Sequence, residues 1–428
     1  MFPRIILSVL FAIVVAIVLI PAREGRAADE TSIPPADHKA IQYANGPLDD
    51  PVTKLDRDLA SGKTKLEFCQ QYGWLPSILR HLDINVDSQM LVFSKTSFQA
   101  SKIGPRAPRA IFFNDQTMVG SVQGGDVFEL ASLDPKQGFA FYTLDVHASS
   151  QPRFDRRDVC LQCHQGPATA GVPGIMVASV FPDAGGMPAF NLGMPVTDHR
   201  TSFQDRWGGW YVTGTHGGMR HRGNAVARDR TKPDVLESQG TQNLTTLGHK
   251  LDDGLYLSHL SDIVALMTLE HQTRMTNLIT RVGWETRIAQ EEGKMDDATS
   301  RAQIDSDIEA LVTYMLFANE AMLYDPVQGV STFTKTFAER GPRDHEGRSL
   351  RDFDLQKRLF KYPLSYMIYS TAFDAMPQAA LERVYKRLFD VLNGVDKSGK
   401  FAKLSEDDRR NVLAILRDTK PNLPSYWR

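Results

Sequence analysis

Five consecutive residues in the middle of the chain limit its possible folds more than any other stretch: Cys160, Leu161, Gln162, Cys163 and His164. Two cysteines separated by two residues and followed by a histidine are the attachment signature of a c-type haem. In such a site the thiols form thioether bonds to the haem vinyl groups, and the imidazole binds the iron. The sequence therefore predicts one covalent haem, attached through Cys160 and Cys163, with His164 as the proximal axial ligand.

Two other interpretations of the cysteine pair stay open. A bare Cys-x-x-Cys pair can be a redox-active dithiol, and it can be half of a zinc site. A zinc site needs further ligands nearby, whereas the third cysteine, Cys69, stands alone in the sequence. A thioredoxin-type pair usually begins a helix in a βαβ unit, whereas residues 165–167 predict a loop after this motif. We interpret Cys69 as a small, half-buried apolar residue.

The first thirty residues predict export from the cytoplasm. Arg4 precedes an apolar run over 5–20, and small residues at 27 and 28 precede an acidic pair. This order is typical of a secretory signal peptide, which we place at residues 1–28, with an uncleaved membrane anchor as the alternative. We therefore expect a periplasmic or secreted bacterial protein. Covalent haem attachment takes place on the exported side of the bacterial membrane, so the two predictions agree.

Composition and charge indicate which broad class of protein the chain belongs to. Hydrophobic residues make up 42% of the chain and charged residues 23%, which is ordinary for a globular protein with a substantial core. The formal net charge of −2 does not favour nucleic acid as a partner. Three cysteines do not form a disulfide framework. The mature part is therefore expected to be stabilised by a core rather than by disulfides.

The predicted elements are strands first and helices second. Residues 29–60 predict a linker and then a short helix. Between 108 and 146, short runs rich in aromatic and β-branched residues alternate with turns of Gly, Pro, Asn and Asp, which predicts an antiparallel meander. The motif follows on an expected loop, and the chain stays rich in loops up to residue 255. Beyond Ser261 the sequence predicts helices over 262–281, 301–324, 354–361, 364–373, 377–393 and 405–417.

This order of elements predicts an α+β fold. We expect a β/loop-rich haem-attachment region over 61–255 and a helical region over 256–428 packed on it. Small cytochrome c domains are helical and carry the motif near their N-terminus. The expected fold is therefore not the small all-α cytochrome c fold, and haem binding does not require that fold.

The second axial ligand of the iron is the main unknown of the predicted site. A methionine or histidine there favours electron transfer, whereas an open position favours ligand binding or catalysis. His271 lies on the apolar face of the first long helix after the motif, where an unpartnered imidazole is costly. His216 lies among glycines, which let the backbone approach a flat cofactor closely. His221, Met187 and Met194 are further candidates.

Each of these candidates has a purely structural alternative. His271 is equally well explained as a core histidine that is bonded to a neighbouring group. His216 and His221 are explained as members of a polar loop that bonds its own backbone. Met187 and Met194, each before a proline, are explained as loop packing.

Arginines are frequent around the motif. Haem carries two propionates, and arginine is a natural partner because its guanidinium can donate two parallel hydrogen bonds to a carboxylate. We take Arg157 as the propionate candidate, with plain surface charge as the alternative. The aromatic cluster of Trp207, Trp210 and Tyr211 could border the haem, but it is equally typical of a core. The other arginines near the motif are Arg153, Arg156, Arg200, Arg206, Arg220 and Arg222.

Several stretches together resemble a family of secreted bacterial proteins with one Cys-x-x-Cys-His motif. Members of that family are described as cytochrome-c-like or uncharacterised. The resemblance covers most of the mature chain and implies export and haem binding, without a particular reaction. The stretches are residues 92–97, 113–115, 160–164, 206–217, 270–272 and 418–424.

The expected function is one-electron transfer by an exported monohaem c-type protein, to or from a redox partner protein or small molecule. The first alternative is a haem enzyme, peroxidase- or oxygenase-like, because an electron carrier does not need a chain of this length. The second alternative is a haem-based sensor. Membrane attachment is expected only if the N-terminal apolar segment is not cleaved.

Overall fold

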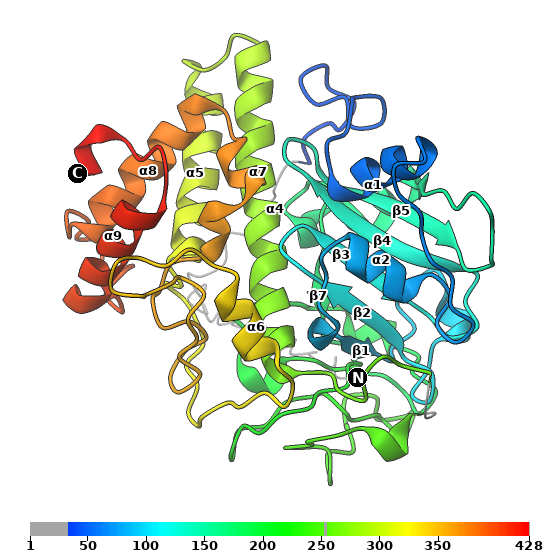
Figure 1. Cartoon of the computed structure of the whole chain (residues 1–428). Coiled ribbons are helices and arrows are strands. Elements are labelled where there is room, and N and C mark those ends of the chain that lie inside the picture. Colours follow the sequence, from blue (N-terminus) through cyan, green and yellow to red (C-terminus); the bar gives the residue numbers. More distant parts are fainter. Residues whose placement is uncertain (1–32, 252–254, 428) are drawn as a thin grey trace, which may run out of the picture. The chain divides into compact units, whose positions relative to one another are not determined.

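An antiparallel sheet of six strands forms the first half of the fold, and each strand pairs with the next along the chain (Figure 1). The computed structural model describes residues 33–251 and 255–427. The predicted meander is confirmed, because its runs correspond to strands β2 to β5. The strands are β1 (Met90–Val92), β2 (Arg109–Phe113), β3 (Thr117–Ser121), β4 (Val127–Asp134), β5 (Gly138–Asp145) and β6 (Asp155–Arg156).

Alternation along the strands places different side chains on the two faces of the sheet. In β5, Phe139 and Phe141 belong to one core cluster, whereas Tyr142 and Leu144 belong to another. Both faces are therefore buried, which explains why β5 is apolar along most of its length.

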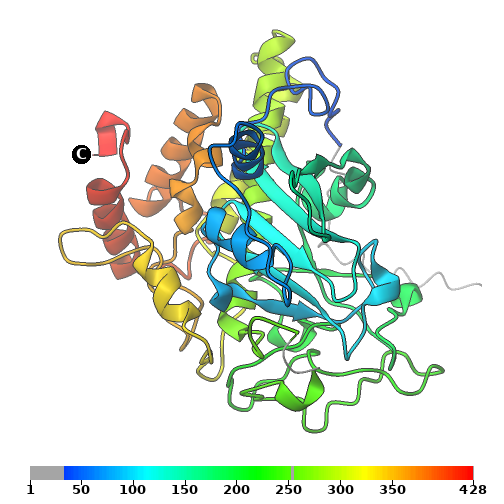
Figure 2. The same ribbon diagram turned by 45° about the vertical axis from the view of Figure 1, so that its right-hand side comes forward.

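Two short helices cover one face of the sheet, and one long helix covers the other. Helices α1 (Pro51–Ala60) and α2 (Leu75–His81) pack on the Tyr142 face, in front of the strands in Figure 2. Helix α4 (Ile263–Glu291) packs on the Phe139 face and runs between the sheet and the other helices in Figure 1. Its N-terminus is fixed by Asp262, whose carboxylate accepts the backbone N–H groups of Val264 and Ala265.

The helical second half of the fold confirms the α+β class. Apolar side chains from these helices and from the Phe139 face of the sheet form one continuous core cluster. Residues 33–427 belong to one compact unit that contains both halves. The remaining long helices are α5 (Ala298–Met315), α8 (Gln378–Leu392) and α9 (Glu406–Thr419), and the shorter ones are α6 (Phe333–Glu339) and α7 (Thr371–Asp374).

Some predicted helix boundaries are wrong, and one predicted helix is missing. Helix α4 extends ten residues beyond the predicted end at 281, and α5 ends at Met315 rather than at 324. Residues 354–361 form a turn, because the Asp354 carboxylate accepts the backbone N–H groups of Gln356 and Lys357. Such a side-chain bond offers the backbone an alternative to helix. Helix α6 was not expected from the pattern.

The loop-rich segment after the motif contains little regular structure. Its two strands, β7 (Val177–Ala178) and β8 (Val196–Thr197), are only two residues long and pair with each other. Residues 210–213 make isolated bridges, from Trp210 to Val92 and from Thr213 to Asp262. This segment therefore connects the edge of the sheet with the start of α4.

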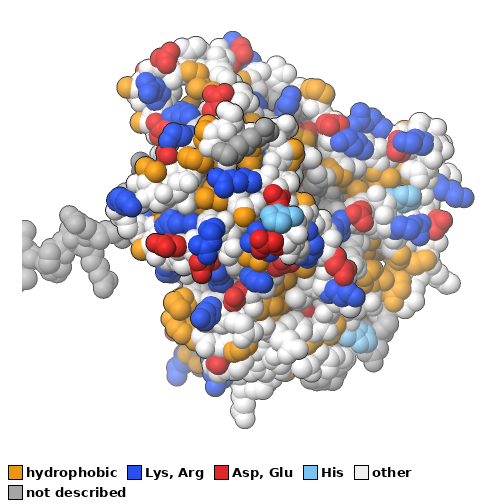
Figure 3. All heavy atoms as spheres, turned by 60° about the vertical axis from the view of Figure 1, so that its left-hand side comes forward, with side chains coloured by type: hydrophobic (Ala, Val, Ile, Leu, Met, Phe, Trp, Pro, Cys, Tyr) orange, Lys and Arg blue, Asp and Glu red, His pale blue; other side chains and the backbone are white. Residues whose placement is uncertain are grey.

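The surface is mixed in charge. On the face that carries the C-terminal helices, Lys and Arg side chains lie beside Asp and Glu side chains (Figure 3). No helix within residues 33–251 and 255–427 is both long and apolar enough to cross a membrane. The predicted signal peptide at residues 1–28 lies outside the described residues.

Candidate functional site

The cysteine motif lies on a helical turn, not on the predicted loop. A 3-10 turn over Asp158–Cys160 leads directly into helix α3 (Leu161–His164). The backbone N–H of Gln165 donates to the Leu161 carbonyl, which closes the turn. Residues four apart on a helix lie on the same side, so this turn brings Cys160 and His164 together. Gly166 and Pro167 then end the helix, so the predicted loop begins after the motif.

The two motif cysteines are free and differ in exposure. Cys160 is half-buried and packs with Leu161 against the core cluster of the sheet, whereas Cys163 is exposed. Burial raises the pKa of the Cys160 thiol, and the negative charge of Glu129 raises it further. A raised pKa is the opposite of what a nucleophilic or redox-active thiol requires. The electrostatics of Cys160 therefore do not favour the dithiol interpretation.

The imidazole of His164 is held in one tautomer. Its Nδ1 lies 2.9 Å from the carbonyl oxygen of Gly174. A carbonyl can only accept, so Nδ1 carries the proton and the lone pair is on Nε2. Burial lowers the pKa of His164, so the ring is neutral at pH 7. A neutral imidazole whose other nitrogen donates to a carbonyl is the usual state of a metal-binding histidine.

Strand β5 supports the motif from the sheet side. The ring of His164 lies 4.9 Å from that of Phe141, measured between centroids. Arg157 donates from its backbone N–H to the Phe141 carbonyl at 2.8 Å, and from Nε to the Thr143 hydroxyl at 3.0 Å. Phe141 and Thr143 are two residues apart on β5, so their side chains point to the same face of the sheet. Arg157 therefore fixes the start of the motif against this face, and its Nε is bonded to the sheet.

The zinc interpretation finds no support in the geometry. Within the part of the chain that the structure describes, no three side chains of His, Cys, Asp or Glu are grouped so that they could hold a metal ion. Cys69 is half-buried and accepts a hydrogen bond from the Tyr72 backbone through Sγ at 3.3 Å. This setting agrees with the packing role that we expected for it.

The structure places His271 in the core, where its ring stacks on those of Tyr314 in α5 and Phe317. It is fully buried, and its Nδ1 lies 2.9 Å from Nδ1 of His199. Its Nε2 lies 2.7 Å from the Ser365 hydroxyl. Burial lowers the pKa of His271 to about 3, so the ring is neutral. Both ring nitrogens therefore have partners, as in the alternative of a core histidine, and iron binding would require the exchange of one of these bonds.

His216 and His221 form a second buried pair. Nε2 of His216 accepts the backbone N–H of Asn243 at 3.2 Å, and the two imidazole centroids are 4.8 Å apart. Burial lowers the pKa of both, that of His221 to about 3. Their ring contacts are with Phe203 and Trp207. The structure thus groups these histidines with each other and not with the motif, as in the polar-loop alternative.

The other sequence candidates fall into two groups. Met187 and Met194 are exposed, at 46% and 44%. Trp207, Trp210 and Tyr211 are buried, and the indole of Trp210 donates to the Ala178 carbonyl at 2.9 Å. The aromatic cluster is therefore part of the core, whereas the two thioethers face solvent.

Most of the arginines near the motif have acidic partners of their own. Arg206 is buried and pairs with Glu270 on α4 at 3.2 Å, which removes it as a propionate candidate. Arg220 is exposed. The remaining pairs are Arg153 with Asp56, Arg156 with Asp158, Arg200 with Asp198 and Arg222 with Asp205.

Two charged residues beside the motif are not marked by any sequence motif. Arg109 on β2 and Glu129 on β4 form an ion pair at 2.8 Å, and both charges act on His164. The only sequence signal is a charged residue at an inward position of a predicted strand. That signal becomes informative only when the strand register is known.

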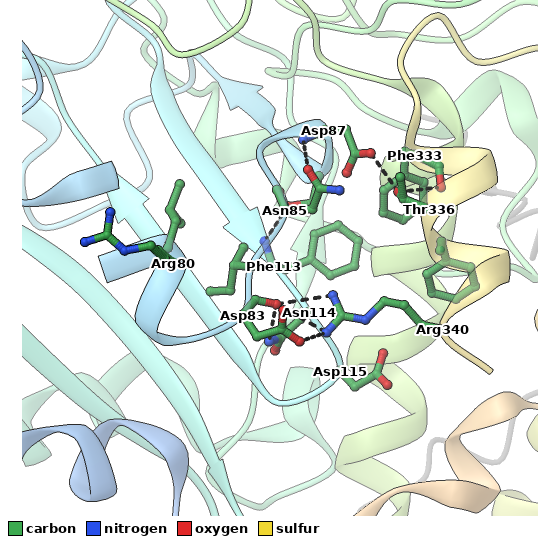
Figure 4. Close-up of a pocket in the computed structure, with 14 residues that line it drawn as sticks. Arg80, Asp83, Asn85, Asp87, Phe113, Asn114, Asp115, Phe333, Thr336 and Arg340 are labelled. Atoms are coloured by element: carbon green, nitrogen blue, oxygen red, sulfur yellow. Dashed lines mark hydrogen bonds and ion pairs between the residues drawn. The ribbon is translucent and has the colours of Figure 1, made fainter. Parts of the chain in front are cut away.

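A separate pocket lies at the other end of β2 (Figure 4). It has a volume of about 480 Å³ and is bordered by the turn after α2, the β2–β3 turn and α6. Phe113, Phe333 and Phe337 form its apolar side. Two of its acidic groups form ion pairs, Asp83 with Arg340 and Asp115 with Arg351. No residue of the motif borders it, so it is distinct from the candidate haem site.

No family model matches the sequence, and no curated protein or solved structure matches it significantly. The resemblance to secreted monohaem proteins therefore stays a prediction from the quoted residues.

Proposed function

We propose that the chain is an exported monohaem c-type protein that transfers single electrons. The observation that carries this proposal is the state of His164, a neutral imidazole whose lone pair is on Nε2, one helical turn from the free thiol of Cys160. A haem bound there supplies an iron that changes between the ferric and ferrous states. The residues present fit this group, because they offer two thiols and an imidazole in the required order.

Each residue of the site has one task in this proposal. Cys160 and Cys163 would hold the macrocycle through two thioethers, and His164 would supply an imidazole nitrogen to the iron. The Gly174 carbonyl fixes the tautomer and orientation of the imidazole. Phe141 packs against the ring from the sheet and keeps water from that side. The rigid sheet thus limits the movement of the site, which suits electron transfer.

The test is an absorption spectrum of the full chain, purified from cells that attach haem to exported proteins. We expect a Soret band that remains with the protein after acid-acetone extraction, because thioether bonds resist it. A six-coordinate, low-spin spectrum that carbon monoxide does not change would support a carrier. A protein without a Soret band, or one that loses its colour on extraction, would refute the proposal.

The alternative of a haem enzyme or sensor is favoured by one observation. His271 and His216 each bind other groups through ring nitrogens in this structure. An iron whose sixth position stays open would be high-spin and would bind carbon monoxide. The same spectrum therefore decides between the two roles.

Replacing His164 with alanine is expected to leave the haem attached and to change its spectrum. The thioethers do not involve the imidazole, whereas the axial bond does. We expect a shifted Soret band and an altered spin state in the purified His164→Ala protein, with colour retained after acid-acetone extraction. His147→Ala is the matched control, because that exposed histidine pairs only with the nearby Asp145. A variant spectrum identical to that of the wild type would exclude His164 as a ligand.

A further inference from the structure

The side chain of Arg109 lies on the face of the sheet that carries the motif. Arg109 begins β2, and Nη1 of its guanidinium donates to Oε2 of Glu129 on β4 at 2.8 Å. Glu129 pairs in register with Thr143 of β5, the residue that accepts a hydrogen bond from Arg157. Residues opposite each other in a sheet point to the same face. The ion pair and the motif are therefore neighbours on one surface.

The neighbours of Glu129 keep its carboxylate ionised and hold it in one position. Its Oε1 accepts hydrogen bonds from the Ser97 hydroxyl at 2.7 Å and from the Gln99 amide at 2.8 Å. Burial raises its pKa, but the charge of Arg109 and these hydrogen bonds outweigh burial and lower it. The carboxylate thus holds the guanidinium in a fixed position without titrating near neutral pH.

The position on β3 beside Glu129 is a glycine. Gly120 of β3 pairs with Ile111 on one side and with Glu129 on the other. A Cβ atom at Gly120 would be in van der Waals contact with Glu129, 3.4 Å from its Cβ and 3.5 Å from its Oε2. The carboxylate end of the ion pair therefore lies close over buried Gly120, on the face of the sheet that carries the motif.

The guanidinium of Arg109 has an unused donor. Its Nε is buried, and within residues 33–251 and 255–427 it has no hydrogen-bond partner. A buried donor of a charged group without an acceptor is unfavourable. Arginine commonly binds a carboxylate through two nitrogens at once. Because Nη1 already donates to Glu129, the unpaired Nε indicates that a second anion can bind at another edge of the guanidinium.

We propose that Arg109 binds a propionate of the haem, and that Glu129 positions Arg109 for it. This inference rests on the proposed haem attachment at Cys160 and Cys163. It adds to Arg157, whose Nε is already used by Thr143. Arg109 is a binding residue in this assignment, and Glu129 is a positioning residue.

The test is the midpoint reduction potential of purified, haem-loaded variants. Arg109→Gln leaves the propionate charge uncompensated, which stabilises ferric iron, so we expect a lower potential. Glu129→Gln removes a negative charge near the iron, so we expect a higher potential. A general loosening of the site would admit water in both variants and would shift both potentials in the same direction. The opposite signs therefore separate an effect of these two charges on the haem from a general loosening of the site, and Arg109→Lys, which keeps the charge, tests the Nε contact itself.

Matched controls are available on an ion pair of similar exposure in the helical half. Arg387 pairs with Glu309 between α8 and α5, and Arg387→Gln and Glu309→Gln should leave the potential unchanged. If Arg109→Gln does not fold, Arg109→Lys keeps the charge and loses the Nε donor, and a smaller decrease is expected. Potentials equal to that of the wild type, or shifts of the same sign, would overturn this inference. A wild-type chain without covalent haem would instead refute the proposed function.

Discussion

Replacing both Cys160 and Cys163 with alanine is expected to abolish covalent haem in the exported protein. The two thiols are the only groups of the motif that can form thioethers, and both are free. Exposed Cys163 and half-buried Cys160 make few contacts that alanine would lose, so the fold should tolerate the change. The measurement is haem absorbance after acid-acetone extraction, together with haem-dependent peroxidase staining of a denaturing gel. Both signals should disappear in the double variant.

The third cysteine provides the control for this experiment. Cys69 is half-buried on a turn stabilised by a bridge to Gly73. Cys69→Ala should therefore keep the full haem content of the wild type. Retained colour in the double variant, or its loss in Cys69→Ala, would contradict the assignment. Each single cysteine variant can still form one thioether, so its haem content should lie between that of the double variant and that of the wild type.

Local patterns predicted the parts of the fold that depend on local interactions. The aromatic and β-branched runs were sufficient to predict the antiparallel meander, because each strand pairs with its neighbour in sequence. The motif itself is five residues long, so the haem prediction needs no knowledge of the fold. The helix predicted over 354–361 is wrong, because the Asp354 carboxylate accepts hydrogen bonds from the backbone of the next residues in place of helical bonds.

The surroundings of the motif could not be predicted, because they depend on long-range contacts. His271 is bonded to His199, which is 72 residues away in sequence, and no pattern along α4 reveals that partner. Arg109 and Glu129 are 20 residues apart and meet only through the strand register. The motif thus yields a prediction of the attachment residues and a list of candidate ligands, whereas tertiary contacts decide which candidates lie near the motif.

The buried pair of Arg206 and Glu270 connects the loop-rich segment to α4 and is expected to dominate the stability of that contact. Arg206 donates to Glu270 at 3.2 Å and to the backbone carbonyls of His199 and Thr201 at 2.8 to 3.0 Å. Arg206→Met removes all these donors and leaves buried Glu270 without its cationic partner. We expect a loss of about 3–5 kcal/mol in the free energy of unfolding at pH 7, measured by urea denaturation.

The loss in Arg206→Met should depend on pH. Burial already raises the pKa of Glu270, and the charge of Arg206 opposes that rise. Without Arg206 the folded state retains a proton on Glu270 that the unfolded state releases above about pH 4.5. The folded state then binds more protons, so the stability of the variant relative to the wild type falls as pH increases. The difference between the two proteins should therefore shrink on acidification.

Two further variants make this prediction specific. Arg230→Met removes an exposed partner of Asp183 and should cost at most about 1 kcal/mol, as surface ion pairs do. Adding Glu270→Met to Arg206→Met removes the isolated carboxylate, so part of the lost stability should return. If Arg206→Met were no less stable than Arg230→Met, or if the second substitution lowered stability further, the buried pair would not hold the loop-rich segment on α4. The loop-rich segment would then be held on α4 by its apolar contacts, among them Trp207 in the core cluster.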